Sequence, residues 1–205
     1  MARSKIYPTF RNFIMAALLI STSASFSMAQ DFGEGLEAYA TGDYQAALQE
    51  WRPLAESGHA LAQLFIGKMY RQGKGVVKHD LEAVYWYRKS AVQGNARAQL
   101  NLGLMYAKGL GVNQDYLEAA VWYLKSANQG HHIAQFNLGQ MYNQGRGVPQ
   151  NYLASHMWFN IAGANGNEDA VEARDLAAGQ LTPQQITQAQ AMAKECLASD
   201  YKNCT

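Results

Sequence analysis

The chain repeats itself along most of its length. Shifted by 36 residues, the sequence aligns with itself without a gap, so that Gly67-Lys68-Met69-Tyr70 recurs at 103–106 and at 139–142. A fixed period of this length is typical of folds that stack one supersecondary unit on the next. Four further series keep the same register: Gly58, Gly94, Gly130 and Gly166; Ala62, Ala98, Ala134 and Ala170; Trp86, Trp122 and Trp158; and the pairs Gly73/Gly75, Gly109/Gly111 and Gly145/Gly147.

The first half of each unit has the spacing of an amphipathic helix, which we call helix A. In the first copy Ala62, Ile66, Met69 and Tyr70 form one apolar stripe. Gly67 lies within this stripe, although a glycine inside a helix costs about 1 kcal/mol relative to alanine. Its recurrence therefore predicts a neighbouring helix too close for a β-carbon. Helix A is predicted at Ala60–Gln72, Ala96–Lys108 and His132–Gln144.

The second half of each unit predicts another helix, helix B. Asp43, Asp115 and Asn151 occupy its N-cap slot, and Glu118 completes a capping-box pattern with Asp115. His79 breaks this series, so the following aspartate is the alternative cap there. The glycine that closes each unit fits the position after a helix where left-handed backbone is needed. Helix B is predicted at Asp80–Gln93, Tyr116–Gln129 and Tyr152–Asn165, with Ala83, Trp86, Tyr87 and Ala91 as its buried face.

The two ends of the array depart from the repeat, as capping units do. Residues 32–40 read as a helix A, but Thr41-Gly42 replaces the long glycine loop. At the other end 168–178 fills the helix A slot, and Thr182 and Pro183 begin a last helix. The prediction is an all-α solenoid of about five antiparallel helix pairs, with an N-terminal cap at 30–58, repeats at 59–166 and a C-terminal cap at 167–205.

These motifs resemble the Sel-one-like repeat (SLR) family of the tetratricopeptide superfamily. The resemblance covers about residues 40–178, with Phe159 in place of a tyrosine. It implies a right-handed superhelix whose concave face is lined by helices A, and an adaptor or scaffold role, without naming a partner. The second unit carries the family pattern as Ala98, Leu102-Gly103, Tyr106, Gly109-Leu110-Gly111-Val112, Asp115-Tyr116, Ala119, Trp122-Tyr123 and Gly130.

The first 29 residues have the composition of an export signal. Three basic residues and no acidic one precede or flank an eight-residue apolar run, Phe13–Ile20. Small side chains follow at the −3 and −1 positions, so we predict cleavage after Ala29 and a periplasmic or secreted mature chain that begins at Gln30. The alternative is a transmembrane anchor, but a membrane-spanning helix needs roughly 20 apolar residues.

The net charge bears on the class of partner, and the cysteine content bears on a disulfide bond. The chain has 17 Lys and Arg against 16 Asp and Glu, and loss of the signal would leave it near −2. A nucleic-acid partner is not expected, because such proteins carry a concentrated basic face. Cys196 and Cys204 are the only cysteines. In an oxidising compartment they are expected to pair and to pin the tail to the last helix, the alternative being two free thiols.

Three chemical motifs have simpler interpretations. Gly67 to Lys74 approaches a phosphate-binding loop, but five residues, not four, separate its two glycines and no strand precedes them. Ser199 and Lys202 spell S-x-x-K without the other motifs of an acyl-transfer enzyme. No metal site and no cofactor are expected, since the five histidines do not have the spacing of ligands; they are His59, His79, His131, His132 and His156.

A partner site is predicted on the helices A, given the geometry that the family resemblance implies. The selected side chains are basic, amide-bearing or apolar, and none is acidic. They would suit a peptide that carries an acidic group, although simple solvent exposure is the alternative interpretation. The predicted groove residues are Phe65, Lys68, Arg71, Arg97, Asn101, Leu104, Lys108, Phe136, Asn137, Gln140 and Asn143.

The sequence thus predicts an exported, monomeric scaffold that binds a peptide or protein and is not an enzyme. Two alternatives stay open at this point. One is a cell-envelope enzyme that acts on peptidoglycan or β-lactams, and the other is a structural protein that assembles with itself.

Overall fold

Every regular element is a helix within the part of the chain that the computed structural model describes, residues 32–202 and 204. The predicted export signal and its cleavage point lie outside these residues. A helix over residues 32–41 comes first. The elements that follow are α2 (Tyr44–Glu56), α3 (Ala60–Gln72), α4 (Asp80–Val92), α5 (Ala96–Lys108), α6 (Tyr116–Ala127), α7 (His132–Gln144), α8 (Tyr152–Ala164), α9 (Asp169–Ala178) and α10 (Pro183–Ala198).

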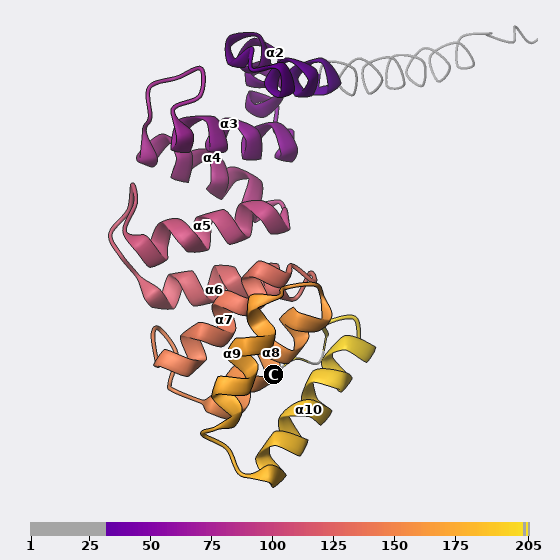
Figure 1. The fold of residues 1–205 in the computed structure, drawn as a ribbon. Coiled ribbons are helices and arrows are strands. Elements are labelled where there is room, and N and C mark those ends of the chain that lie inside the picture. Colours follow the sequence, from indigo (N-terminus) through magenta and orange to yellow (C-terminus); the bar gives the residue numbers. More distant parts are fainter. Residues whose placement is uncertain (1–31, 203, 205) are drawn as a thin grey trace, which may run out of the picture.

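The helices stack in chain order into one solenoid, which confirms the predicted fold class (Figure 1). Helices A and B of one unit form the tightest pairs, namely α3 with α4, α5 with α6, and α7 with α8. Each helix B then packs on the helix A of the next unit, as α4 does on α5. The end of the array differs, because both α9 and α10 pack mainly on α8.

Side-chain caps set the starts of the helices. Asp43, Asp115 and Asn151 accept the predicted backbone hydrogen bonds at about 3.0 Å. The alternative cap at Asp80 was wrong, because the Nδ1 atom of His79 accepts the Glu82 N–H at 3.2 Å and Asp80 begins the helix itself. A neutral imidazole nitrogen is an acceptor. Helices B end one or two residues earlier than predicted, at Val92, Ala127 and Ala164.

The interior glycines are required by the neighbouring helix, as predicted. A β-carbon on Gly67 would lie 2.7 Å from the ring of Tyr87, on the paired helix B, and 3.3 Å from the Ala83 carbonyl oxygen. The same contact recurs between Gly103 and Tyr123 in the second unit. Helices A and B of a pair therefore approach so closely that an aromatic ring fills the place of the missing side chain.

The interior is aromatic from the first helix to the last repeat. The tryptophans of helices B are between 0 and 7 % exposed, and they alternate with the methionines and leucines of helices A. One buried tryptophan removes about 150–250 Å² from water, so these rows supply much of the hydrophobic stabilisation. The tryptophans are Trp51, Trp86, Trp122 and Trp158.

A ladder of buried amides also links the repeats, and the sequence analysis did not predict it. Gln99 donates to the Ala91 carbonyl oxygen at 3.1 Å and accepts from Gln129 at 2.7 Å, so one side chain joins helices of two units. Gln63 and Gln135 make the corresponding bonds in the units before and after. Buried polar groups need such partners, and here the need fixes the register of one repeat on the next.

The tail closes the far end of this ladder. Cys196 of α10 is joined to Cys204 by a disulfide. The Tyr201 hydroxyl, inside the loop so formed, donates to the Asn165 Oδ1 atom at 3.1 Å. Asn165 in turn donates to Gln135, the last glutamine of the ladder, at 2.9 Å.

Candidate functional site

One row of side chains on each helix A faces away from the paired helix B. The members of a row are four, three and four residues apart, so they lie on a single helical face. All are exposed or half-buried, because the opposite face carries the packing residues. We call these twelve positions the helix A wall: Leu61, Phe65, Lys68 and Gln72 on α3; Arg97, Asn101, Leu104 and Lys108 on α5; and Ile133, Asn137, Gln140 and Gln144 on α7.

Eight of the eleven predicted groove residues lie on this wall, and three do not. Arg71 turns toward the start of α4 and forms an ion pair with Asp80 at 3.5 Å. Phe136 packs its ring 5.5 Å from that of Phe159, in an interior cluster. Asn143 occupies the position of Arg71 two units later, and its carbonyl oxygen accepts a hydrogen bond from Gln150. Four wall positions were missed: Leu61, Gln72, Ile133 and Gln144.

Aromatic packing holds the N-terminal part of the wall. The Phe65 ring lies 4.7 Å from Trp51 and 5.9 Å from Phe32, between centroids. The Lys68 ammonium group lies over the same Phe65 ring at 5.1 Å. A cation above an aromatic face is favourable, so Lys68 is held in place while its charge remains at the surface.

Positive groups gather along the wall without an acidic neighbour. Burial lowers the pKa of Lys68, and the nearby charges of Arg97 and Lys74 lower it further. Burial likewise lowers the pKa of His131, with further effects of His132 and then Arg97. The charge of Arg97 thus lowers the pKa of one group on each side of it, Lys68 and His131.

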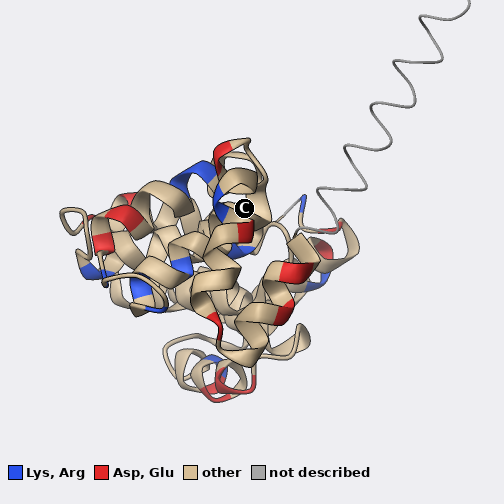
Figure 2. Ribbon diagram, turned by 90° about the horizontal axis from the view of Figure 1, so that it is seen from above, with Lys and Arg blue, Asp and Glu red and all other residues tan. Residues whose placement is uncertain are grey.

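The wall helices lack acidic residues, a feature that only α8 shares among the other described helices. The segments α3, α5 and α7 contain no aspartate or glutamate, whereas α4, α6 and α9 all do. Over the whole described chain both signs are dispersed among the helices, as Figure 2 shows from above. Among the described residues, the basic side chains are therefore not concentrated on one broad face.

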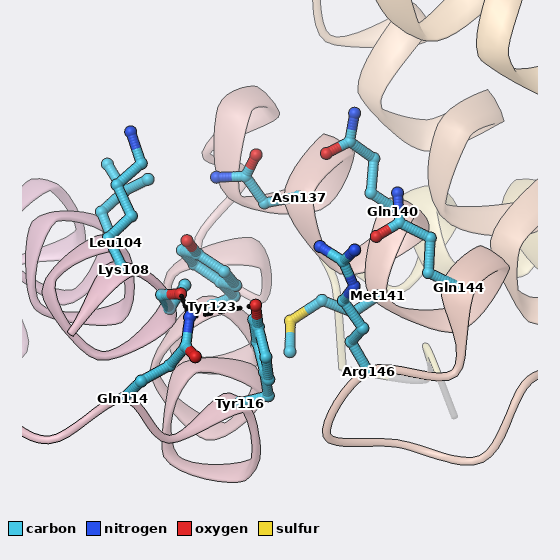
Figure 3. Close-up of a pocket in the computed structure, with 11 residues that line it drawn as sticks. Leu104, Lys108, Gln114, Tyr116, Tyr123, Asn137, Gln140, Met141, Gln144 and Arg146 are labelled. Atoms are coloured by element: carbon cyan, nitrogen blue, oxygen red, sulfur yellow. Dashed lines mark hydrogen bonds between the residues drawn. The ribbon is translucent and has the colours of Figure 1, made fainter.

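A pocket of about 470 Å³ opens in the wall between α5 and α7. Its volume lies in the range of small-ligand sites. Tyr116, Tyr123 and Met141 form its floor, while Leu104 and the amide and basic groups stand around it (Figure 3). It is lined by Leu104, Ala107, Lys108, Gln114, Tyr116, Tyr123, Asn137, Gln140, Met141, Gln144 and Arg146.

Two loop residues shape one side of this pocket. The amide of Gln114 donates to the Ala107 carbonyl oxygen at 2.8 Å and to the Tyr116 hydroxyl at 3.0 Å (Figure 3). The Arg146 guanidinium lies 5.6 Å from the centre of the Tyr116 ring.

Tyr123 forms the back of the pocket, and burial raises its pKa, which keeps the phenol neutral. The sequence analysis did not place these loop side chains in the site.

The corresponding place one repeat earlier is built differently. There Arg71 stands at the position of Ala107, and Asp80 stands at the position of Tyr116. These two side chains form the ion pair described above. The side chains that line the two places therefore differ, a small residue and a ring in one standing where the other has an ion pair.

Among residues 32–202 and 204, no group of three His, Cys, Asp or Glu side chains is arranged to hold a metal ion. The Ser199 hydroxyl donates to the Cys196 carbonyl oxygen at 2.9 Å, at the end of α10. No helix in the same described range is long and apolar enough to cross a membrane.

The repeats match a known family model. The model for the Sel1 repeat aligns with residues 60–95, 96–131 and 132–167, more than half of the chain. The chain belongs to the Sel1 repeat family. A search of curated protein sequences gives no match.

Solved Sel1 repeat structures share the fold of this chain. A Sel1 repeat protein from Oxalobacter formigenes is 34 % identical, with a TM-score of 0.69, over 78 % of this chain and 68 % of that one. A protective antigen of uropathogenic Escherichia coli with an SLR fold is 27 % identical, with a TM-score of 0.60 over 90 % of this chain. This chain spans 49 % of that antigen.

A more distant structure shows the fold alone. The cysteine-rich protein B of Helicobacter pylori is 20 % identical, with a TM-score of 0.52, over 62 % of this chain and 95 % of its own length.

Sel1 repeat proteins generally mediate protein–protein interactions, and their scaffolds are generally adaptors rather than enzymes.

Proposed function

We propose that this Sel1 repeat protein is an exported scaffold that binds a peptide or a protein segment along its helix A wall. The observation that carries the proposal is the charge pattern: the three wall helices hold Lys68, Arg97 and Lys108 on the wall and no acidic residue at all. A bound segment with a carboxylate would complement this surface.

The amide side chains of the wall suit an extended backbone. Asn101, Asn137 and Gln140 each offer both a donor and an acceptor, which is what a peptide group requires. A peptide bound there would use these groups for main-chain hydrogen bonds and the basic groups for its acidic side chains. No cofactor and no catalytic step are part of this proposal.

Export is the second part of the proposal. The basic start and apolar run of residues 1–29 support it, and so does the Cys196–Cys204 disulfide, because such bonds persist in oxidising compartments. We expect the mature protein to begin at Gln30. Mass spectrometry of the protein recovered from the cell envelope would test this, and an intact Met1 in that fraction would contradict it.

The binding proposal is tested by affinity capture. Immobilised mature protein is exposed to envelope extract, bound proteins are identified, and their affinity is measured in purified form. The double variant Arg97→Gln, Asn101→Ala is expected to lose the specific partner while it keeps the melting temperature. A partner captured equally well by wild type and variant would contradict binding at the wall.

Self-association is the competing role, and one observation favours it. Several apolar side chains are exposed on the outer faces of α4 and α6, among them Leu81 at 59 % and Leu117 at 62 %. Light scattering over a hundredfold range of concentration separates the two roles. A constant monomer mass supports the scaffold, whereas a mass that grows and then falls on Leu117→Gln supports assembly.

A further inference from the structure

The outer faces of α4, α6 and α8 begin with the same apolar residue but differ in exposure. Leu81, Leu117 and Leu153 share one position of the repeat. Leu81 and Leu117 are 59 and 62 % exposed, whereas Leu153 is half-buried. One turn further along, Val121 of α6 is exposed, but Met157 of α8 is buried. Something therefore covers the outer face of α8 that does not cover the outer face of α6.

The helix that covers α8 is α10. It packs on α8 (Figure 1), and its residues Ala189 and Ala193 are buried in the same hydrophobic cluster as Met157. The Tyr201 hydroxyl, just after α10, donates to Asn165, just after α8, so the C-terminal ends of the two helices lie together. The chain thus contains one example of an amphipathic helix bound to the outer face of a helix B.

The hydrophobic surface that α10 uses continues onto α6. The half-buried Leu124 of α6 packs against the cluster that contains the buried residues of α10. The ring of Tyr201 approaches Gly130, in the loop after α6, so closely that a β-carbon there would lie 3.0 Å from it. Leu117 and Val121 extend the same surface into solvent.

A lysine marks the difference between the covered and the uncovered faces. Lys89 of α4 and Lys125 of α6 share one position of the repeat, which Ile161 occupies on α8. Ile161 is fully buried. The Lys125 ammonium group lies 4.3 Å from the centre of the Trp122 ring and forms no ion pair within the described residues. An acidic side chain on a covering helix would pair with it.

The outer face of α4 is partly covered by its own side chains. The Tyr85 ring packs edge-on against Trp86, with 5.0 Å between centroids, and the Lys89 ammonium group lies 4.7 Å from the centre of the Tyr85 ring. On α6 the smaller Val121 stands at the position of Tyr85. The open site is therefore on α6 rather than on α4.

We propose that the outer face of α6 binds an amphipathic α-helix of a partner protein, in the way that α10 binds α8. The partner helix places small and apolar side chains, three or four residues apart, on Leu117, Val121 and Leu124. An acidic residue at the edge of its apolar stripe pairs with Lys125. This face is separate from the helix A wall, so the inference does not depend on the binding proposed there.

The first probe copies the helix that covers α8. It is a fluorescein-labelled peptide with the sequence of residues 182–198, in which serine replaces Cys196 so that no disulfide forms. A hydrocarbon staple joins positions 187 and 191, which are exposed in α10 and lie opposite its buried alanines. The staple is needed because an isolated helix of this length is marginally stable. A scrambled peptide of the same composition and staple is the control.

The second probe adds charge. It also carries Gln188→Glu and Gln190→Glu, which lie at the two edges of the apolar stripe. Fluorescence anisotropy measures the binding of each probe to the mature, oxidised chain. Both probes are expected to bind, unlike the scrambled control. The acidic probe is expected to bind about fivefold more tightly at low salt and to lose this advantage at high salt, where exposed charges are screened.

Variants of α6 assign the site. Leu117→Gln combined with Val121→Gln is expected to weaken both probes at least about tenfold. Leu176→Gln, which removes an exposed leucine of α9, is the matched control and is expected to change nothing. Lys125→Ile copies Ile161 of α8, so it is expected to keep the binding of the first probe and to remove the preference for the acidic one. Thermal unfolding checks that each variant is folded.

Several results would overturn the site. They are equal binding of the probes and the scrambled peptide, no binding of either probe, and loss of binding in Leu81→Gln of α4 instead of the α6 variant. A dimer seen by light scattering that Leu117→Gln dissociates would assign the face to a second copy of the chain. Partner capture that depends on Arg97 and Asn101 would stand in each of these cases, because it concerns the helix A wall.

Discussion

The interior of the solenoid and its helix A wall follow opposite rules. Interior positions repeat almost unchanged, as Gly67, Gly103 and Gly139 do, because each must meet the same ring of the paired helix. Wall positions change from unit to unit: Phe65 is followed by Asn101, and Lys68 by Leu104. Packing therefore explains the constant positions and leaves the variable ones free to recognise a partner.

The largest effect is expected from an interior tryptophan. Trp122→Ala should lower the free energy of unfolding by about 3–5 kcal/mol, because the side chain is 7 % exposed and bridges two units. Urea denaturation would measure this. An unchanged midpoint would mean that the aromatic rows do not hold the repeats together.

An interior glycine should give the next largest effect. Gly103→Ala places a methyl group 2.7 Å from the Tyr123 ring, and overpacking of this kind costs about 1–3 kcal/mol. Gly33→Ala is the control, because a β-carbon there would meet nothing within 4 Å. Equal melting temperatures for the two variants would show that the close helix approach is not a constraint.

Acid should weaken the start of α3 through its cap, His59. Burial lowers the pKa of His59 below its usual 6.5, so at low pH the unfolded chain binds more protons than the folded one. The free energy of unfolding therefore falls as the pH drops below about 6.5. Protonation also removes the Nδ1 acceptor that caps α3, a bond worth about 1 kcal/mol.

The second repeat provides the variant for this titration. Asn95 caps α5 in the slot that His59 occupies before α3. His59→Asn should keep the cap and make stability less sensitive to pH between 7 and 5, as measured by thermal unfolding at each pH. An identical pH profile for wild type and variant would exclude His59 as a contributor.

The smallest effect on stability should come from the wall. Arg97→Gln is expected to change the free energy of unfolding by less than about 0.5 kcal/mol, since exposed positions without special contacts are tolerant. The same change should weaken partner binding. A large loss of stability would show that the wall is part of the packing and would weaken the contrast between the two regions.

The sequence predicted local features well and cross-repeat features poorly. Helices A begin and end where predicted: a side-chain cap marks the starts of α3 and α5, and a left-handed glycine marks the ends of all three. The sequence analysis missed the amide ladder, because a glutamine is typical of a surface. Only the fold brings Gln129 beside Gln99. The packing of α10 on α8 was missed for a similar reason: no periodic pattern connects them.

The same limit applies to predicting the residues that line the pocket. Leu104, Lys108, Asn137 and Gln140 were predicted from their places on the helices. Arg146 could not be, because its role depends on how a loop folds over the Tyr116 ring. One signal was present in the sequence, however: Ala107 is the small residue in a column that elsewhere holds arginine or asparagine.

The tail closes the end of the amide ladder and thereby fixes the length of the solenoid. Tyr201 donates to the Asn165 amide oxygen, and within the described residues α10 packs on α8 instead of pairing with α9 as a regular helix B would. Growth by duplication is therefore compatible with insertion between existing units and not with addition at this end. The number of wall helices, and with it the length of chain that a partner can lay across them, is set by the tail.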